Sequence, residues 1–343
     1  MLETMQLTDF QFPFDPSLIA SHPVRPRDHA RLLVVPKEQG SFCDSHIFDL
    51  PNLLLPGDLV VVNDTRVIPA RVMGTKLPSG GKVELLVLRS SGHDQWEVLL
   101  KGKVRVGQRI RLEGDAEAVV EERSQDRTVV SIKSPLSGRE LLQHVGQMPL
   151  PPYIKRQPTK DDREDYQTMF AQADGAIAAP TAGLHFTPQL LTALTEKHIQ
   201  VARITLHVGA GTFRPVTVSK VEEHRMEPEW FHIPEATAQA IARVKQSGGR
   251  VVAVGTTVTR SLESAVETGG NVCAQEGQTN LFVTPGYRFQ VVDALLTNFH
   301  LPGTTLLMLI AAFAGLEQSR AAYEHAVRER YRFYSYGDAM LIQ

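Results

Sequence analysis

Residues that could take part in chemistry are concentrated at 178–187 (AAPTAGLHFT), where Thr181 and His185 stand among small and apolar residues. A proline and a glycine three positions apart predict a shaped turn there, not the interior of a helix or strand. Thr187 is a suitable N-cap, and Pro188 a suitable first residue, for the amphipathic run that follows. Backbone N–H groups converge at such a helix N-terminus and favour an anionic or polar ligand. The alternative is a plain loop before a helix, with His185 capping it or half-buried.

Further polar clusters follow predicted strands or open predicted helices. They lie at 63–66 (NDTR), 207–213 (HVGAGTF), 255–260 (GTTVTR), 297–302 (TNFHLP) and 335–340 (SYGDAM). Strand ends and their loops are where sites are usually built. Each cluster alone is more typical of turn chemistry than of catalysis, but several at element ends indicate one composite site. Thr256 is expected to cap a helix on which Arg260 and Glu263 form a possible pair.

The motifs argue against several kinds of site. His185, His207, His224 and His300 lack the close His or Cys spacing of a zinc site, so no metal is expected. The chain has no Gly-x-x-x-x-Gly-Lys-Ser/Thr loop, which disfavours an ATPase, and no Gly-x-Ser-x-Gly elbow, which disfavours an α/β-hydrolase. Gly-x-Gly at 209–211 is weak evidence for a nucleotide loop, because no helical pattern follows it.

Length and composition are those of a globular protein. The 343 residues suggest about two domains; 42% are hydrophobic, 22% are charged, and the net charge is −2. Cys43 and Cys273 are far apart in sequence, which suits a reducing compartment. No basic n-region of a signal peptide is visible, and the longest apolar run, 306–313, is too short to cross a membrane. A cytoplasmic location is therefore expected.

Between 67 and 147 the pattern consists of short β runs separated by turn signals, at 68–73, 82–88, 95–100, 108–112, 116–121 and 128–132. Such closely spaced short strands predict a compact antiparallel β-barrel. Elsewhere strands are expected at 31–35, 59–62, 201–208, 250–254, 281–284 and 289–296, and helices at 188–198, 234–246, 256–266, 304–316 and 320–331. The predicted fold is an α/β main domain, 1–66 with 148–343, interrupted by an inserted small antiparallel β-barrel domain at 67–147.

Charge is spread unevenly along the chain. Basic residues outnumber acidic ones between positions 66 and 139, whereas the remainder is acidic. Lys101, Lys103 and Arg105 alternate with no acid between them, and are expected on one strand face. This stripe is a candidate phosphate-binding surface for RNA, and a solvated strand face is the alternative.

A long and ordered set of motifs runs along the whole chain. Its members are 56–59 (PGDL), 63–71 (NDTRVIPAR), 149–154 (PLPPYI), 166–168 (YQT), 178–187 (AAPTAGLHFT), 205–213 (TLHVGAGTF), 254–257 (VGTT), 297–302 (TNFHLP) and 331–340 (YRFYSYGDAM). Through these motifs the chain resembles the S-adenosylmethionine:tRNA ribosyltransferase-isomerase family of queuosine biosynthesis, essentially from end to end.

The resemblance implies an activity. S-adenosylmethionine is a co-substrate that donates its ribosyl part, not its methyl group, and no prosthetic group is implied. The ribosyl part moves to 7-aminomethyl-7-deazaguanine at the wobble position of tRNA and is isomerised, which gives epoxyqueuosine and releases adenine and methionine. The resemblance also implies an α/β domain with an inserted β-barrel, and a cytoplasmic monomer that binds tRNA and no membrane.

The implied chemistry needs at least one base and one acid. The sulfonium makes the C5′ proton more acidic, but a positioned base must remove it, and adenine leaves poorly unless it is protonated. We therefore expect the proton-transfer groups among His185, His207, His300, Asp64 and Asp338. Which of them is base and which is acid does not follow from the sequence.

Other residues are expected to bind the substrates. A carboxylate or phosphate is expected on the planar guanidinium groups of Arg66, Arg71 and Arg260. A splayed anticodon base is expected to stack on an aromatic ring, for which the candidates are Tyr153, Tyr166 and Phe186; core or hinge packing is the alternative for each. The remaining expected contacts are Thr181, Gly183, Gly209, Gly211, Thr212, Thr256, Thr257 and Asn298.

Three positions depart from the pattern of this family. Asp165 stands where Arg is usual, Glu227 where a second His is usual, and Gly303 where Lys is common, which puts a role for these positions in doubt.

Two other functions stay open. A conventional tRNA methyltransferase would release S-adenosylhomocysteine, but the chain lacks an acidic-residue-led Gly-rich loop that opens a helix. A non-catalytic tRNA-binding module would bind RNA without donor turnover, but the density of His, Asp and Arg at loop ends argues against it.

Overall fold

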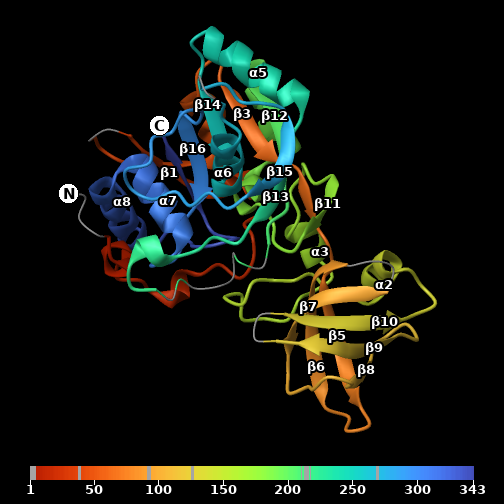
Figure 1. Ribbon diagram of the computed structural model, residues 1–343. Helices are drawn as coiled ribbons and strands as arrows, with labels where there is room; N and C mark the ends of the chain where they lie inside the picture. Colours follow the sequence, from red (N-terminus) through yellow and green to blue (C-terminus); the bar gives the residue numbers. More distant parts are fainter. Residues whose placement is uncertain are drawn as a thin grey trace.

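The structure is a computed structural model that describes residues 5–37, 40–90, 94–124, 127–209, 211, 216, 218–267 and 270–343. A large mixed sheet with helices forms one part, and a closed β-barrel lies to one side of it (Figure 1). The predicted architecture, an α/β domain interrupted by a small antiparallel barrel, is confirmed. The predicted boundaries at 67 and 147 stay a prediction.

The main sheet has nine strands in the order β15-β13-β12-β3-β14-β16-β17-β1-β2. Its strands are β15 (Gln275–Thr279), β13 (Glu229–Ile233), β12 (Gln200–Leu206), β3 (Leu59–Asn63), β14 (Val251–Val254), β16 (Ala294–Asn298), β17 (Ala339–Ile342), β1 (Arg31–Val35) and β2 (Cys43–His46). The central strand β3 is parallel to β12 and β14, and β14 is parallel to β16. All five residues of β3 are buried, as expected for a β-branched run in a parallel sheet covered on both faces.

Helices cover both faces of this sheet, and alternate residues of β3 show the two layers. Leu59 and Val61 pack in a core with α5 (Glu235–Gln246), α6 (Thr256–Ser264), α7 (Thr305–Ala314) and α8 (Leu316–Arg328). Val60 and Val62 pack in a second core with α1 (Leu50–Leu53) and α4 (Pro188–Glu196). The predicted start of α4 is confirmed, because Thr187 Oγ1 accepts a hydrogen bond from Leu190 N and Pro188 opens the helix.

The barrel closes in the order β10-β7-β6-β5-β8-β9. Its strands are β5 (Arg71–Leu77), β6 (Lys82–Ser90), β7 (Gln95–Lys101), β8 (Arg109–Arg111), β9 (Glu117–Arg123) and β10 (Thr128–Lys133). Trp96 is fully buried inside the barrel. Helix α2 (Gly138–Val145) packs on the barrel, and a capping box of Ser137 and Glu140 forms its N-terminus. The segments before and after the barrel pair with each other: β4 (Thr65–Val67) and β11 (Ala173–Ala176) form a two-stranded parallel sheet beside it. Helix α3 (Asp162–Asp165) lies nearby (Figure 1).

Three local predictions were wrong. The strand expected at 281–284 is irregular, and the real strand, β15, is the polar edge run QEGQT, which carries no apolar alternation. Lys103 and Arg105 lie beyond the end of β7, so they do not share a strand face with Lys101. The N-cap of α6 is Gly255, whose positive φ of 93° a threonine would adopt only with strain.

Candidate active site

A cavity of about 440 Å³ lies at the ends of the central strands, within the size range of small-molecule sites. Thr256 and Thr257 follow β14, Asn298 ends β16, and Gly209 follows β12. These strands are parallel, so their carboxyl ends meet at one edge of the sheet, where open α/β sheets usually bind ligands. The segments 178–182, 223–229 and 334–335 also form part of the walls.

The predicted residues fall into two groups. Ten line this cavity: Tyr153, Tyr166, Thr181, Gly209, Gly211, Thr256, Thr257, Arg260, Asn298 and His300. Eight are described but are not among its lining residues: Asp64, Arg66, Arg71, Gly183, His185, Phe186, His207 and Asp338. Thr212 lies outside the described residues.

His300 is the predicted proton-transfer group that lines the cavity. Its Nε2 is 3.1 Å from Thr297 Oγ1, and its backbone N–H donates to Tyr323 Oη at 3.0 Å. Burial lowers the pKa of His300 to about 3, because the charged ring would lose its hydration. His300 is therefore neutral at pH 7.

His185 does not line the cavity itself but interacts with Asn298, which does. Burial lowers the pKa of His185 to about 4, against the opposing effects of Asp338 and Asn298. His185 Nε2 and Asn298 Oδ1 are both buried without a well-formed hydrogen bond in the described part of the chain. Asn298 Nδ2 donates to Tyr334 O at 3.0 Å, which fixes the orientation of the amide.

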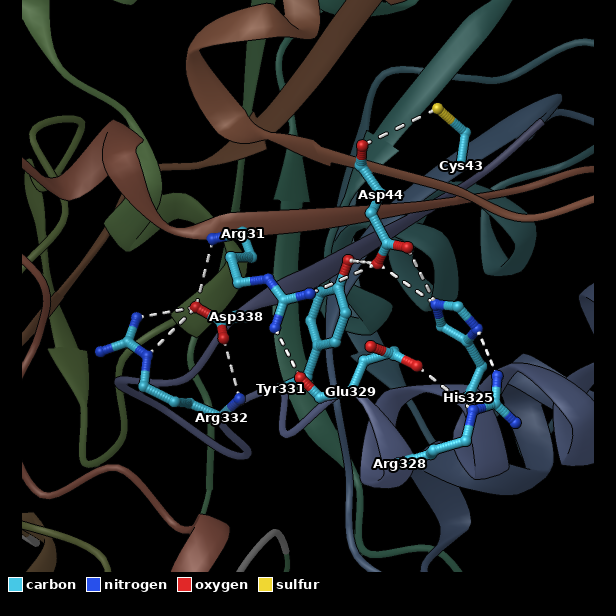
Figure 2. Close-up of polar contacts among 9 residues, drawn as sticks. All are labelled: Arg31, Cys43, Asp44, His325, Arg328, Glu329, Tyr331, Arg332 and Asp338. Carbon is cyan, nitrogen blue, oxygen red and sulfur yellow. Dashed lines mark hydrogen bonds and ion pairs between the residues drawn. The ribbon is translucent and has the colours of Figure 1, made fainter.

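Asp338 is buried in a polar cluster beside His185. Its carboxylate accepts from the backbone N–H groups of Arg31 and Arg332, and from the Arg332 guanidinium at 2.8 Å (Figure 2). The same figure shows Arg31 reaching Asp44, which also contacts His325 (Figure 2). These bonds occupy Asp338, so in this structure it orients its neighbours and does not face the cavity.

His207 and Asp64 form a separate group next to β4. His207 Nδ1 is 2.8 Å from Thr65 Oγ1, and its ring stacks on Trp230 with 4.9 Å between ring centres. Burial lowers the pKa of His207, and the negative charge of Asp64 opposes that effect. Asp64 itself accepts from Thr205 Oγ1 at 2.6 Å.

The predicted arginines are already bound to protein groups. Arg66 donates to Ala171 O at 2.8 Å, and Arg71 pairs with Glu84 on the barrel at 2.8 Å. Arg260 forms a buried ion pair with Glu229 in the cavity wall. The predicted pairing of Arg260 with Glu263 was wrong.

Glu263 instead caps a neighbouring loop. Its carboxylate accepts from the backbone N–H groups of Gln290, Val291 and Val292 at 2.9–3.0 Å. Arg260 therefore forms its ion pair with Glu229 instead of Glu263.

Two residues expected at the site are packing residues in this structure. Phe186 is buried against Phe170 with 5.3 Å between ring centres, so its faces are covered, as in the core-packing alternative. Gly183 is buried where an added Cβ would lie 3.0 Å from Thr168 Cγ2. The close fit explains a glycine at this position without a ligand.

Several lining residues were not identified from the sequence. Glu229 is the first residue of β13 and occupies a buried position of an alternating strand. A carboxylate at an inward-facing position of a strand could have identified Glu229 from the sequence, because a buried charge requires a partner. Tyr334 also lines the cavity. Its neighbour Ser335, which belongs to the predicted polar cluster at 335–340, lines it too, and its Oγ lies 2.6 Å from Tyr153 Oη.

The three departures have different surroundings. Asp165 is buried and pairs with Arg25 at 2.7 Å. Gly303 has a positive φ of 68°, a conformation that favours glycine over lysine. Glu227 lines the cavity, with its Oε2 3.0 Å from where a Cβ on Gly211 would be.

Two kinds of feature were not found in the described part of the chain. No three His, Cys, Asp or Glu side chains gather there as metal ligands would. No helix within the described ranges is both long and apolar enough to cross a bilayer.

Comparisons with known proteins cover nearly the whole chain. A family model described as queuosine biosynthesis protein matches residues 7–342. The S-adenosylmethionine:tRNA ribosyltransferase-isomerase of Stenotrophomonas maltophilia (strain R551-3) is 49% identical over 340 residues, 98% of each chain. That of Xylella fastidiosa (strain 9a5c) is 49% identical over 342 residues, 98% of this chain and 97% of the relative. The crystal structure of S-adenosylmethionine tRNA ribosyltransferase from Thermotoga maritima is 33% identical with a TM-score of 0.57, covering 98% of this chain and 100% of that one.

Proposed function

Because the chain belongs to the queuosine biosynthesis protein family, we propose that its cavity transfers and isomerises the ribosyl part of S-adenosylmethionine on a tRNA base. The protein is a tRNA-modifying ribosyl transferase and isomerase of queuosine biosynthesis. The observation that carries this function is the family match over residues 7–342.

The substrates and products form the finer part of the proposal. The acceptor is 7-aminomethyl-7-deazaguanine at the wobble position of tRNA, and the products are epoxyqueuosine, adenine and methionine. S-adenosylmethionine enters as a co-substrate and no prosthetic group takes part. The protein works as a cytoplasmic monomer. These details rest on the motif resemblance described above.

The cavity suits a donor of this kind. Its walls combine backbone at Gly209 and Gly211 with the N-terminus of α6 at Thr256 and Thr257. Backbone N–H groups at a helix start stabilise a carboxylate, such as that of the methionine part. Since Arg260 is engaged by Glu229, we assign the carboxylate to the N-terminus of α6 and not to the guanidinium.

Proton transfer is proposed for His300, whose neutral ring lines the cavity. His185 and Asp338 are proposed to act on the cavity through Asn298, as positioning groups. His207 and Asp64 form the second candidate pair for proton transfer. Water exclusion by the buried walls would protect the reactive intermediate.

The tRNA is proposed to approach with its anticodon loop at the cavity and its phosphates on basic side chains of both parts of the molecule. Arg66 and the barrel residues Lys101, Lys103 and Arg105 are exposed or partly exposed candidates for phosphates. Arg71 is proposed to orient the barrel edge through Glu84.

The deciding experiment is turnover of S-adenosylmethionine with tRNA that carries the aminomethyl-deazaguanine. Adenine and methionine released only with that tRNA are the expected result, and unmodified tRNA is the control. S-adenosylhomocysteine in place of adenine would contradict the proposal and favour a methyltransferase. Tight tRNA binding without any donor turnover would favour the binding-module alternative.

A further inference from the structure

Tyr334 combines a position in the cavity wall with an unusual backbone conformation. Its φ is 70°, in the left-handed region, which bulky side chains rarely adopt. Three other non-glycine residues in the described ranges share this conformation. His198 and Arg330 follow the ends of α4 and α8, and Asp115 lies in a turn. The left-handed conformation is common at both kinds of position.

Surrounding groups hold Tyr334 in this conformation. Its N–H donates to Phe299 O at 3.0 Å, and its carbonyl accepts from Gly337 N at 2.9 Å and from Asn298 Nδ2 at 3.0 Å. Strain that is overdetermined in this way is typical of residues whose exact orientation matters for a site.

The strained backbone places the Tyr334 ring against Tyr153. The ring centres are 3.7 Å apart and the planes are inclined by 36°. Tyr153 is held in turn by its hydroxyl, 2.6 Å from Ser335 Oγ. Both rings are part of the cavity lining and both are partly buried, so they form a rigid aromatic wall.

We propose that Tyr334 and Tyr153 together form the stacking platform for the purine-type base of a substrate. The inference rests on the proposed function, which brings two such bases to the cavity: the adenine of S-adenosylmethionine and the 7-deazaguanine of the tRNA. Fixed aromatic faces bind bases by stacking, at little cost in side-chain entropy. Tyr334 is thereby a further substrate-binding residue, and its strain sets the direction of the platform.

The test measures binding without turnover. Calorimetry gives Kd for S-adenosylmethionine and, separately, for an anticodon stem-loop RNA that carries 7-aminomethyl-7-deazaguanine. Tyr334→Gly removes the ring but accepts the positive φ, and Tyr334→Phe is the matched control that keeps the ring. Tyr153→Leu removes the second ring at a position without backbone strain, and melting temperatures identify any variant that does not fold.

Loss of stacking is expected to raise one Kd by about 5- to 100-fold in Tyr334→Gly and Tyr153→Leu, whereas Tyr334→Phe stays near the wild type. A rise for S-adenosylmethionine identifies adenine as the stacked base, and a rise for the RNA identifies the deazaguanine. Unchanged Kd values in folded Tyr334→Gly, or an equal loss in Tyr334→Phe, would overturn the platform. Failure of the proposed function is separate, because it shows as absent adenine release by the wild type.

Discussion

The buried ion pair between Glu229 and Arg260 gives the sharpest prediction about stability. Glu229 is 7% exposed and Arg260 is 5% exposed. Glu229 Oε1 also accepts from Gly209 N at 3.0 Å, and Arg260 Nε donates to Leu281 O at 2.9 Å. The pair therefore joins β13, α6 and the loop after β12 in one wall of the cavity.

Glu229→Gln removes the charge but keeps a side-chain oxygen for the Gly209 N–H. Arg260 is then a buried charge without its counterion, which costs about 3–5 kcal/mol in comparable pairs. At roughly 2 °C per kcal/mol for a large domain, the melting temperature should fall by about 6–10 °C. Thermal unfolding followed by calorimetry or circular dichroism measures this directly.

The double variant Glu229→Gln/Arg260→Met tests the cause. Removing both charges should recover a large share of the loss, because no uncompensated charge remains. Recovery should be incomplete, since the bond from Arg260 to Leu281 O is also lost. The matched control is Glu117→Gln, which breaks the exposed pair with Arg109 and should leave the melting temperature unchanged. A Glu229→Gln midpoint within 2 °C of the wild type (about 1 kcal/mol), or a double variant that is no more stable than Glu229→Gln alone, would refute the reasoning.

Three further predictions follow from the site and the fold. Burial holds the pKa of His185 at about 4 and that of His300 at about 3, below the ordinary histidine value of 6.5. The free energy of unfolding is therefore at its full value above pH 6.5 and falls as pH drops toward 4. The His185 contribution, about 3 kcal/mol, should disappear in urea titrations of His185→Gln, and an unchanged pH slope would contradict it. Gly303→Ala should lower stability by about 1 kcal/mol or more because φ is +68°, whereas an equal or higher urea midpoint would show that the loop relaxes. Lys103→Gln/Arg105→Gln should raise the Kd for tRNA and flatten its dependence on salt; a slope equal to the wild type would remove the barrel from the RNA-binding surface.

Local chemistry in the sequence was sufficient for much of the fold. The apolar run of β3, the Thr187–Pro188 helix start and the closely spaced barrel strands depend on neighbours in the chain, and all are confirmed. The polar strand β15 was missed because it lies at the edge of the sheet, where most of its side chains are exposed. Its sequence therefore lacks the alternation of apolar residues that identifies a half-buried strand.

The candidate site, like the fold, was determined in part by the sequence and in part by the tertiary structure. The sequence by itself determined the family, and it also placed Gly209, Thr256 and Asn298 at the ends of strands that the topology brings to one edge. Only the tertiary structure decided which polar groups face the cavity, because that depends on contacts that form when the chain packs, such as the one between Arg31 and Asp338, 307 residues apart. Asp338 is turned to Arg31 and Arg332, and Glu229 binds the arginine that the sequence had assigned to substrate. A sequence records which groups can ionise or hydrogen-bond, but their partners are fixed when the chain packs.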